Sequence, residues 1–416
     1  MNVSRPLIAT VEREALGAGA LPPAPRPGSN VGAATERSNR PRVLVLAQLP
    51  PPEHGASAVN RQVVNSLTLR DAFDMTVVPI AMSGNIARLR QFDLRKVWRS
   101  LALFGSTAKA LFGRRRPDLA YFTLSPAGWA FYRDLALIVL IRAARVRHVF
   151  HLHGRGITSS IEKAPWRQRL YRFAFAKSYV ITLGGTLHDE VKGLVDNDRI
   201  YVVPNGVSDT ALPSELRHDD TSRRRTDERP PRVLFVSNML EEKGPLVLID
   251  ALALVARLGI RFDAYFAGAW RASLSEDRFT AHVQSLGLEK QVTHLGPVYG
   301  EAKARLFADA DVFVLPTYYR HEALPLAVIE AMMHGLAIIT TRVGALPDLV
   351  TDQVNGDLVA PGDTAQLASA LERLLTDSDL CARYGRAARE KYETALTAQR
   401  FEERLKAVLL EIVGRP

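Results

Sequence analysis

Short apolar runs recur along this chain of 416 residues, and segments with helical periodicity separate them. Short runs without polar alternation are typical of parallel strands that are buried on both faces. Because helices alternate with them, the sequence predicts an α/β protein with two doubly wound parallel sheets. The strands expected in the first sheet are residues 42–47, 76–80, 119–123, 148–154, 179–182 and 200–203, and those in the second are 233–236, 262–266, 292–295, 312–315 and 337–340.

The polar, charged and turn-forming stretch 208–231 separates the two series of strands, as a linker or surface loop would. We therefore predict a disordered tail over 1–40, an α/β domain over 41–207 and a second one over 208–396. A C-terminal helix at about 397–416 is expected to pack back on the first domain. Ligands of such sheets bind beyond the C-terminal strand ends, so the expected site lies in the cleft between the sheets.

The formal net charge of +10 permits nucleic acid, a phosphorylated substrate or a membrane surface as partner and does not choose among them. A single cysteine, Cys381, excludes an internal disulfide framework and a cysteine-built zinc site. We find no apolar run long enough to span a bilayer and no signal-peptide core. The expected location is the cytoplasm. Basic residues between Arg88 and Arg116, mixed with Trp98 and other apolar residues, suit either an anionic membrane or a solvated basic face.

The stretch from Glu322 to Glu330 holds the most specific pattern, because two carboxylates flank seven residues that are nearly all apolar. Pro325 is placed to open a helix and Gly335 to close it. Inside that helix Glu330 lies on or beside the apolar side, where a carboxylate needs a polar partner. That partner is either a vicinal diol such as a ribose or His334, four residues further on.

Three other segments have the composition of anion or substrate contacts. The backbone N–H groups of Ala323 and Leu324, just before the helix, suit a phosphate. Lys243 follows a strand in a Glu-Glu-Lys-Gly-Pro turn and is either a diphosphate clamp or part of a solvated turn. Gly55 follows the first strand, in either an anion-binding loop or a plain tight turn.

His153 is expected at the mouth of its strand, where an imidazole can donate to a substrate oxygen near neutral pH. His151, two residues earlier, projects to the same side and is interpreted as a core histidine. A metal site at the pair would need a third ligand that is not close in sequence. The Asp196–Asp198 turn is interpreted as solvated rather than metal-binding. No Gly-x-Gly-x-x-Gly or P-loop pattern is present, which argues against a nicotinamide enzyme and a P-loop ATPase.

Taken together, these motifs resemble the retaining glycosyltransferases of the two-domain GT-B fold, in particular the bacterial family 4 group (glycosyl transferases group 1). The resemblance covers roughly residues 42 to 412 and is strongest in the second half. The segments that carry it, besides Glu322–Glu330, are His153–Gly154, Pro204–Val207, Glu242–Gly244, Val343–Asp348 and Asn355–Asp363.

The resemblance implies two Rossmann-like domains facing across a cleft and a nucleotide-sugar donor held mainly by the second domain. Glu330 would bind the ribose, Lys243 the departing diphosphate, and Glu322 with Ala323 and Leu324 the sugar and its phosphate. His153 would reach the transferred sugar. The resemblance implies no metal, no cofactor and no nucleic acid partner. It implies a glycan or lipid-linked acceptor, in bacterial surface polysaccharide or glycolipid synthesis.

Three positions depart from the family pattern. Asn238 stands where an arginine is usual, five residues before Lys243, so one donor-binding cation is missing unless Arg320 or another residue replaces it. Ala56 stands where a second glycine is common, and His334 where a small residue is usual. Alternatives to transfer are a nucleotide-sugar epimerase on the same fold and a nucleotide-sugar-binding protein without catalysis.

Overall fold

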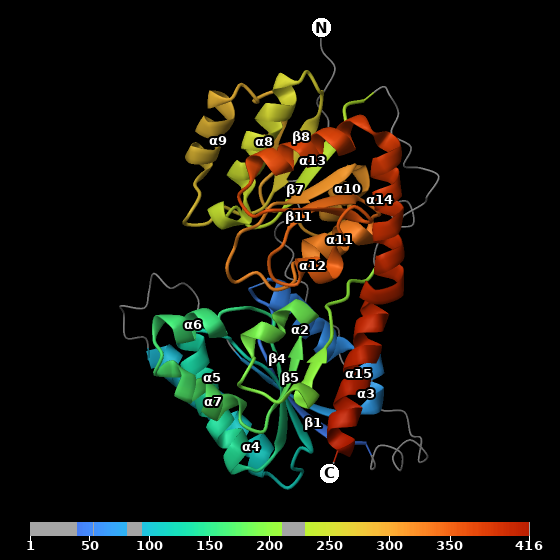
Figure 1. Cartoon of the computed structure of the whole chain (residues 1–416). Helices are drawn as coiled ribbons and strands as arrows, with labels where there is room; N and C mark the ends of the chain where they lie inside the picture. The colour runs from blue at the N-terminus through green and yellow to red at the C-terminus, as the bar shows by residue number, and fades with distance from the viewer. Residues whose placement is uncertain (1–39, 53, 81–93, 210–228, 416) are drawn as a thin grey trace. The chain divides into compact units, whose positions relative to one another are not determined.

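The computed structural model describes residues 40–52, 54–80, 94–209 and 229–415, and within them the chain forms two parallel six-stranded sheets (Figure 1). Residues 1–39 of the proposed tail and most of the proposed linker therefore lie outside the described residues. The first sheet has the strand order β2-β1-β3-β4-β5-β6 and the second β12-β11-β10-β7-β8-β9. All their pairings are parallel, which confirms the predicted fold class.

The strands of the first sheet are β1 (Arg42–Ala47), β2 (Asp74–Pro79), β3 (Leu119–Thr123), β4 (Arg147–His151), β5 (Tyr179–Thr182) and β6 (Ile200–Val202). The helices between them are α2 (Gly55–Asn65), α3 (Leu67–Ala72), α4 (Leu94–Phe112), α5 (Gly128–Ala143), α6 (Ile157–Lys163) and α7 (Arg167–Phe175), with 3₁₀ turns η2 (Gly185–Glu190) and η3 (Asn197–Arg199).

The second sheet contains β7 (Arg232–Val236), β8 (Asp263–Ala267), β9 (Val292–His294), β10 (Val312–Leu315), β11 (Ala337–Thr341) and β12 (Gly356–Val359). Its helices are α8 (Pro245–Arg257), α9 (Glu276–Ser285), α10 (Gly300–Asp309), α11 (Leu326–Met333), α12 (Leu346–Leu349), α13 (Thr364–Thr376) and α14 (Ser378–Lys391), with the 3₁₀ turn η5 (Glu241–Lys243). A π-helical turn, η6 (Tyr392–Leu396), then leads into the last helix, α15 (Ala398–Gly414).

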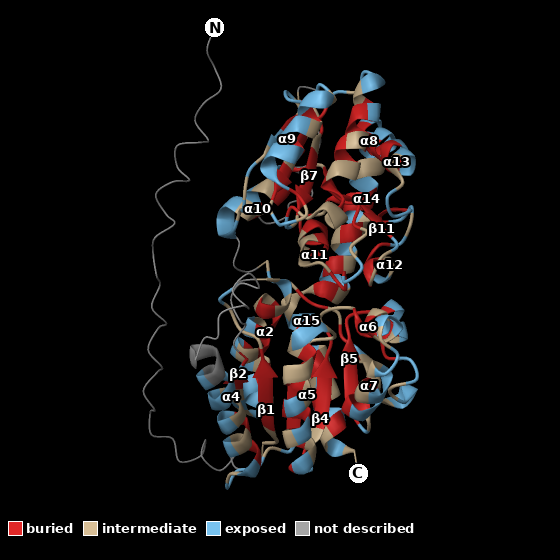
Figure 2. Cartoon of the chain, turned by 90° about the vertical axis from the view of Figure 1, so that its left-hand side faces the viewer, coloured by how far each residue is buried: buried red, intermediate tan, exposed pale blue. Residues whose placement is uncertain are grey.

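The inner strands of the first sheet, β1, β3, β4 and β5, are buried on both faces, as their continuous apolar runs require (Figure 2). In β1, Val43 and Val45 point into one core and Leu44 and Leu46 into the other, because side chains alternate along a strand. Helices α4, α5 and α7 cover the Leu44 face, whereas α2, α3 and α15 cover the Val43 face. Such two-sided burial explains why this strand shows no polar alternation in the sequence.

Helix α15, the last element of the chain, packs on the first sheet. Its apolar residues recur every three or four positions and form one buried stripe. The residues of that stripe are Phe401, Leu405, Leu409 and Ile412. The chain arrives there beside Val207, whose N–H donates to Leu396 and whose carbonyl accepts from Ala398.

Several boundaries differ from the predicted ones. Strand β4 ends at His151, so His153 lies in the following loop rather than in the strand. Helix α2 begins directly at Gly55, where His54 and Ser57 form a capping box. Pro325 is the N-cap of α11 rather than its first residue, and Gly335 ends the helix in the left-handed conformation with φ 64°. The expected set of strands omitted β12.

Replacing Leu405 by alanine should lower the free energy of unfolding by about 2–5 kcal/mol, because its fully buried side chain fills the contact between α15 and the first sheet. Leu410→Ala on the same helix is the matched control, since that side chain is 40% exposed and its loss should change stability by about 0.5 kcal/mol or less. Urea denaturation measures both values. Equal losses in the two variants would contradict this packing.

Candidate functional site

A cavity of about 840 Å³ lies beyond the C-terminal ends of strands from both sheets. On the side of the first sheet, α2 and the loop after β4 line it. On the side of the second sheet, it is lined by the loops after β7, β8 and β10 and by α10 and α11. The structure brings all of the sequence-predicted site residues to its wall, although they are spread over most of the chain. These residues are Gly55, His153, Asn238, Lys243, Glu322, Ala323, Leu324 and Glu330.

Lys243 and Glu322 form an ion pair at this wall, with 2.5 Å between Nζ and Oε2. The two side chains are only 12% and 7% exposed. The hydroxyl of Thr317 also faces the same carboxylate oxygen, at 3.4 Å. In a partly buried site such a pair is held in one geometry, so the ammonium group is positioned before any ligand arrives.

The position of Lys243 depends on the glycine that follows it. Gly244 has φ 82°, a conformation that favours glycine, and it links η5 to α8. A Cβ at this position would also lie 2.3 Å from the carbonyl oxygen of Pro316, at the end of β10. Gly244 therefore lets the lysine-bearing turn approach the loop that carries Glu322.

Glu330 is neutralised by Lys303 of α10, whose Nζ lies 2.7 Å from Oε1 and 2.6 Å from Oε2. The expected alternatives were a bound diol and His334. The imidazole of His334 stacks on Phe307, with ring centroids 5.7 Å apart and planes 10° from parallel. Lys303 and Glu330 are 27% and 19% exposed, so their pair is open to the cavity.

The two ring nitrogens of His153 are buried and find no hydrogen-bond partner within the described residues. Burial, with a smaller contribution from nearby His54, lowers the pKa of His153 to about 3. The ring is therefore neutral near pH 7 and offers one donor and one acceptor to a ligand. His151 packs 4.1 Å from it, centroid to centroid, and its Nδ1 lies 2.6 Å from the hydroxyl of Tyr121 in the core. His151 is thus the core residue that the sequence predicted.

Two charged residues of the cavity wall, among the described residues beyond residue 228, were not predicted from the sequence. The sequence does not mark Lys303 as a binding residue, because lysines are common on the polar face of an amphipathic helix. Arg271 lies just beyond the end of β8 and donates to the side-chain oxygen of Asn238. Its position could have been flagged, since ligands of parallel sheets bind beyond the C-terminal strand ends.

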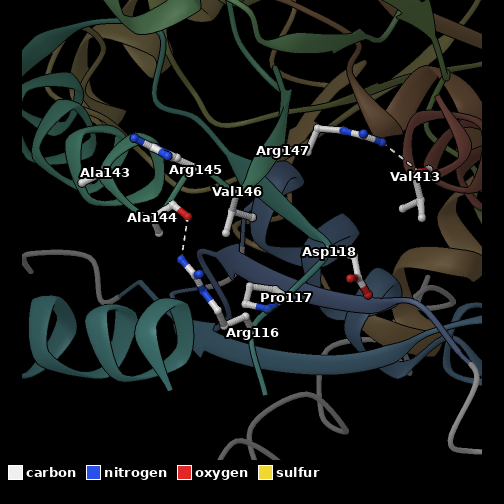
Figure 3. A pocket seen from close by; sticks show the side chains of 9 residues that line it. All are labelled: Arg116, Pro117, Asp118, Ala143, Ala144, Arg145, Val146, Arg147 and Val413. Atoms are coloured by element: carbon white, nitrogen blue, oxygen red, sulfur yellow. Dashed lines mark hydrogen bonds between the residues drawn. The ribbon is translucent and has the colours of Figure 1, made fainter. Parts of the chain in front are cut away.

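A second cavity, of about 650 Å³, lies at the opposite, N-terminal edge of the first sheet (Figure 3). Two of its three arginines donate to carbonyl groups at helix ends. Arg116 donates to the carbonyl of Ala144, after α5, and Arg147 donates to the carbonyls of Ile412 and Val413 in α15. Guanidinium groups at these carbonyls satisfy acceptors that a helix end leaves open. We therefore assign this cavity a structural role.

The described residues contain no group of three or more His, Cys, Asp or Glu side chains that could hold a metal ion. Asp196 and Asp198 are largely exposed and face Arg199 and Arg415 at 3.8 and 3.5 Å, as expected of a solvated turn. In the same part of the chain, no helix combines the length and apolar character needed to cross a membrane.

Comparisons with known proteins identify the two sheets with two family models. Residues 42–211 match the model described as Glycosyltransferase Family 4, and residues 217–391 match Glycosyl transferases group 1. A curated relative, D-inositol 3-phosphate glycosyltransferase of Arthrobacter sp. (strain FB24), is 32% identical over 219 residues. That alignment covers 52% of this chain and 50% of the relative, so the chain spans about half the length of the curated relatives it matches.

Solved structures resemble the whole fold. Sucrose-phosphate synthase from Thermosynechococcus elongatus superposes with a TM-score of 0.67 at 18% identity, over 90% of this chain and 99% of the other. HepE of Anabaena, solved in complex with UDP-glucose, gives a TM-score of 0.64 at 19% identity, over 89% and 99%. At these identities the likeness establishes the arrangement of the sheets and not the ligand.

The buried His153 should make the protein less stable in mild acid. The unfolded chain binds a proton at this histidine below about pH 6.5, whereas the folded protein does not until about pH 3. The free energy of unfolding should therefore fall as the pH drops through this window, by up to about 1.4 kcal/mol per pH unit from this residue.

The His153→Gln variant isolates that contribution, because glutamine does not titrate. Its unfolding free energy, measured by urea denaturation between about pH 7 and pH 5, should decline less steeply than that of the unmodified protein. Identical slopes for the two proteins would show that His153 titrates normally.

Proposed function

Since the chain belongs to the glycosyltransferases of the GT-B fold, we propose that it moves a sugar from a nucleotide-sugar donor to a glycan or lipid-linked acceptor with retention of anomeric configuration. The observation that carries the proposal is that Lys243, Glu322, Glu330 and a neutral His153 line one cavity. The complex of HepE with UDP-glucose supports a nucleotide-sugar donor. The pathway that we propose is assembly of a bacterial surface polysaccharide or glycolipid.

The donor would lie along the wall formed by the second sheet. Glu330 would accept hydrogen bonds from the ribose hydroxyls, and Lys303 would remain close enough to share the carboxylate. The backbone N–H groups of Ala323 and Leu324 precede α11 and suit a phosphate or sugar hydroxyl. Glu322, fixed by Lys243, would accept from a hydroxyl of the transferred sugar.

Transfer needs stabilisation of the leaving diphosphate. The bond from the anomeric carbon to the phosphate oxygen breaks, and its electron pair stays on that oxygen. The acceptor oxygen bonds to the anomeric carbon on the face from which the phosphate leaves. The acceptor proton passes to the departing phosphate oxygen, so charge and atoms balance. Lys243 stabilises the negative charge that develops on the phosphate. Neutral His153 donates to the sugar without adding a charge.

We also propose peripheral contact with an anionic membrane through a surface at and just after α4. Trp98, Leu101 and Phe112 are exposed there, and the exposed Arg114 and Arg115 follow. Exposed aromatic and apolar residues next to arginines suit the boundary between headgroups and acyl chains. Arg88 and Arg90 of the predicted basic region lie outside the described residues.

A donor screen tests the proposed transfer. Purified protein is incubated with a panel of nucleotide sugars and a membrane extract, and release of nucleoside diphosphate is followed, with the anomeric configuration of the product read by NMR. Acceptor-dependent release with retention is expected. Epimerised donor without acceptor would identify an epimerase, and tight donor binding without turnover would identify a binding protein.

Glu330→Ala should weaken nucleotide binding by about 10- to 100-fold, because it removes charge-assisted hydrogen bonds to the ribose. Isothermal titration calorimetry measures this loss. Glu301→Ala on α10 is the control, since Glu301 is exposed and pairs with Arg305 outside the cavity. Unchanged affinity in Glu330→Ala would show that Glu330 does not bind the nucleotide and serves only as the ion-pair partner of Lys303.

Lys243→Ala should lower kcat by about 100-fold or more, because the leaving diphosphate loses a positioned cation. Lys290→Ala is the control, as that lysine is exposed and away from the cavity. Initial rates at saturating donor separate this effect from weaker binding. A change in KM alone would assign Lys243 to binding and not to the transfer step.

Membrane contact predicts co-sedimentation with phosphatidylglycerol vesicles that weakens as salt is raised, and little binding to phosphatidylcholine vesicles. Trp98→Ala combined with Leu101→Ala should reduce the bound fraction, whereas Leu258→Ala, at an exposed position of the second half, should not. Binding independent of lipid charge and of both substitutions would rule out this surface.

A further inference from the structure

The charges at the cavity wall from the second half of the chain do not balance. Among the described residues beyond residue 228, that wall carries three cations and two carboxylates. Lys243 is bound to Glu322, and Lys303 to Glu330. Each pair is neutral as a unit and attracts a distant anion weakly, because the two charges largely cancel. The surplus positive charge of this wall therefore comes from Arg271.

Arg271 is held in place by a neutral partner. Its Nε and Nη2 lie 3.2 and 2.9 Å from Oδ1 of Asn238, so two of its five N–H groups donate to an amide oxygen. No carboxylate lies within ion-pair distance of it in the described part of the chain. The amide orients the guanidinium group without cancelling its charge, and Nη1 stays available for a ligand.

The backbone around Arg271 is also fixed. The loops that follow β7 and β8 are joined by hydrogen bonds from Met239 to Ala269, at 2.9 Å, and from Arg271 to Met239, at 3.2 Å. They approach so closely that a Cβ at Gly268 would lie 1.7 Å from the carbonyl oxygen of Ser237. The arginine thus projects from a rigid double loop at the ends of two neighbouring strands.

We propose that Arg271 binds the diphosphate of the nucleotide-sugar donor and that Asn238 is the positioning residue that orients it. This inference rests on the proposed function and names the residue that supplies the charge for that site. Asn238 itself carries no charge, and the neighbouring loop places the Arg271 cation directly beside it. The free edge of the guanidinium group, formed by Nη1 and Nη2, matches two phosphate oxygens in the way that a lysine cannot.

The test measures binding of UDP, GDP, ADP, dTDP, inorganic pyrophosphate and uridine by isothermal titration calorimetry. Arg271→Ala should weaken binding of the preferred nucleoside diphosphate and of pyrophosphate by about 10- to 100-fold and leave nucleoside binding unchanged. Arg271→Lys should recover only part of the loss. Arg278→Ala is the matched control, because that arginine pairs with Glu241 away from the cavity and should bind as the unmodified protein does.

Asn238 gives a second, independent readout. Asn238→Ala should weaken diphosphate binding several-fold, with a KM increase and little change in kcat, because the guanidinium group loses its orientation. The double variant Asn238→Arg with Arg271→Ala should regain most of the affinity, because residue 238, in the loop after β7, then supplies the positive charge. Arg271→Ala that binds as tightly as the unmodified protein, while Glu330→Ala does not, would overturn this inference alone. An unmodified protein that binds none of the nucleoside diphosphates would overturn the proposed function as well.

Discussion

The requirement that a carboxylate removed from water find a cation governs the site. Glu322 and Glu330 belong to one short, largely buried stretch around the start of α11. Neither can be stable there alone. The fold places Lys243 beside the first, from the turn after β7, and Lys303 beside the second, from α10. Two ion pairs therefore tie three separate segments of the second sheet into one wall.

These pairs also set the electrostatic character of the cavity. A pre-formed pair holds both side chains in one orientation. This lowers the entropic cost of ordering these side chains when a ligand binds. The same pairing removes their net charge. A wall built in this way is polar and rigid but close to neutral, and an anion responds most strongly to the arginine that has only an amide for a partner. On the opposite side, burial keeps His153 uncharged.

Strand positions were predictable because each strand is a local apolar run, and β1, β3, β5 and β10 lie where the sequence placed them. The strand ends were less predictable. β4 stops at His151 because the ladder to β5 ends there, which the residues 152–154 do not reveal. β12 was missed because Gly356–Val359 is short, and Asp357 in it is a buried carboxylate whose partner, Arg373, comes from α13. The proposed limits of the tail and linker stay predictions.

The sequence by itself determined the two α/β sheets, the helix that starts after Pro325 and the residues that would gather at the strand ends, because periodicity and turn chemistry are local properties. Only the tertiary structure decided the partners. Glu330 meets Lys303, and Asn238 meets Arg271, over separations of 27 and 33 residues. Such pairs depend on which loops the sheet order makes neighbours, and a lysine or arginine on a surface helix or loop carries no local mark of the charge that it will face.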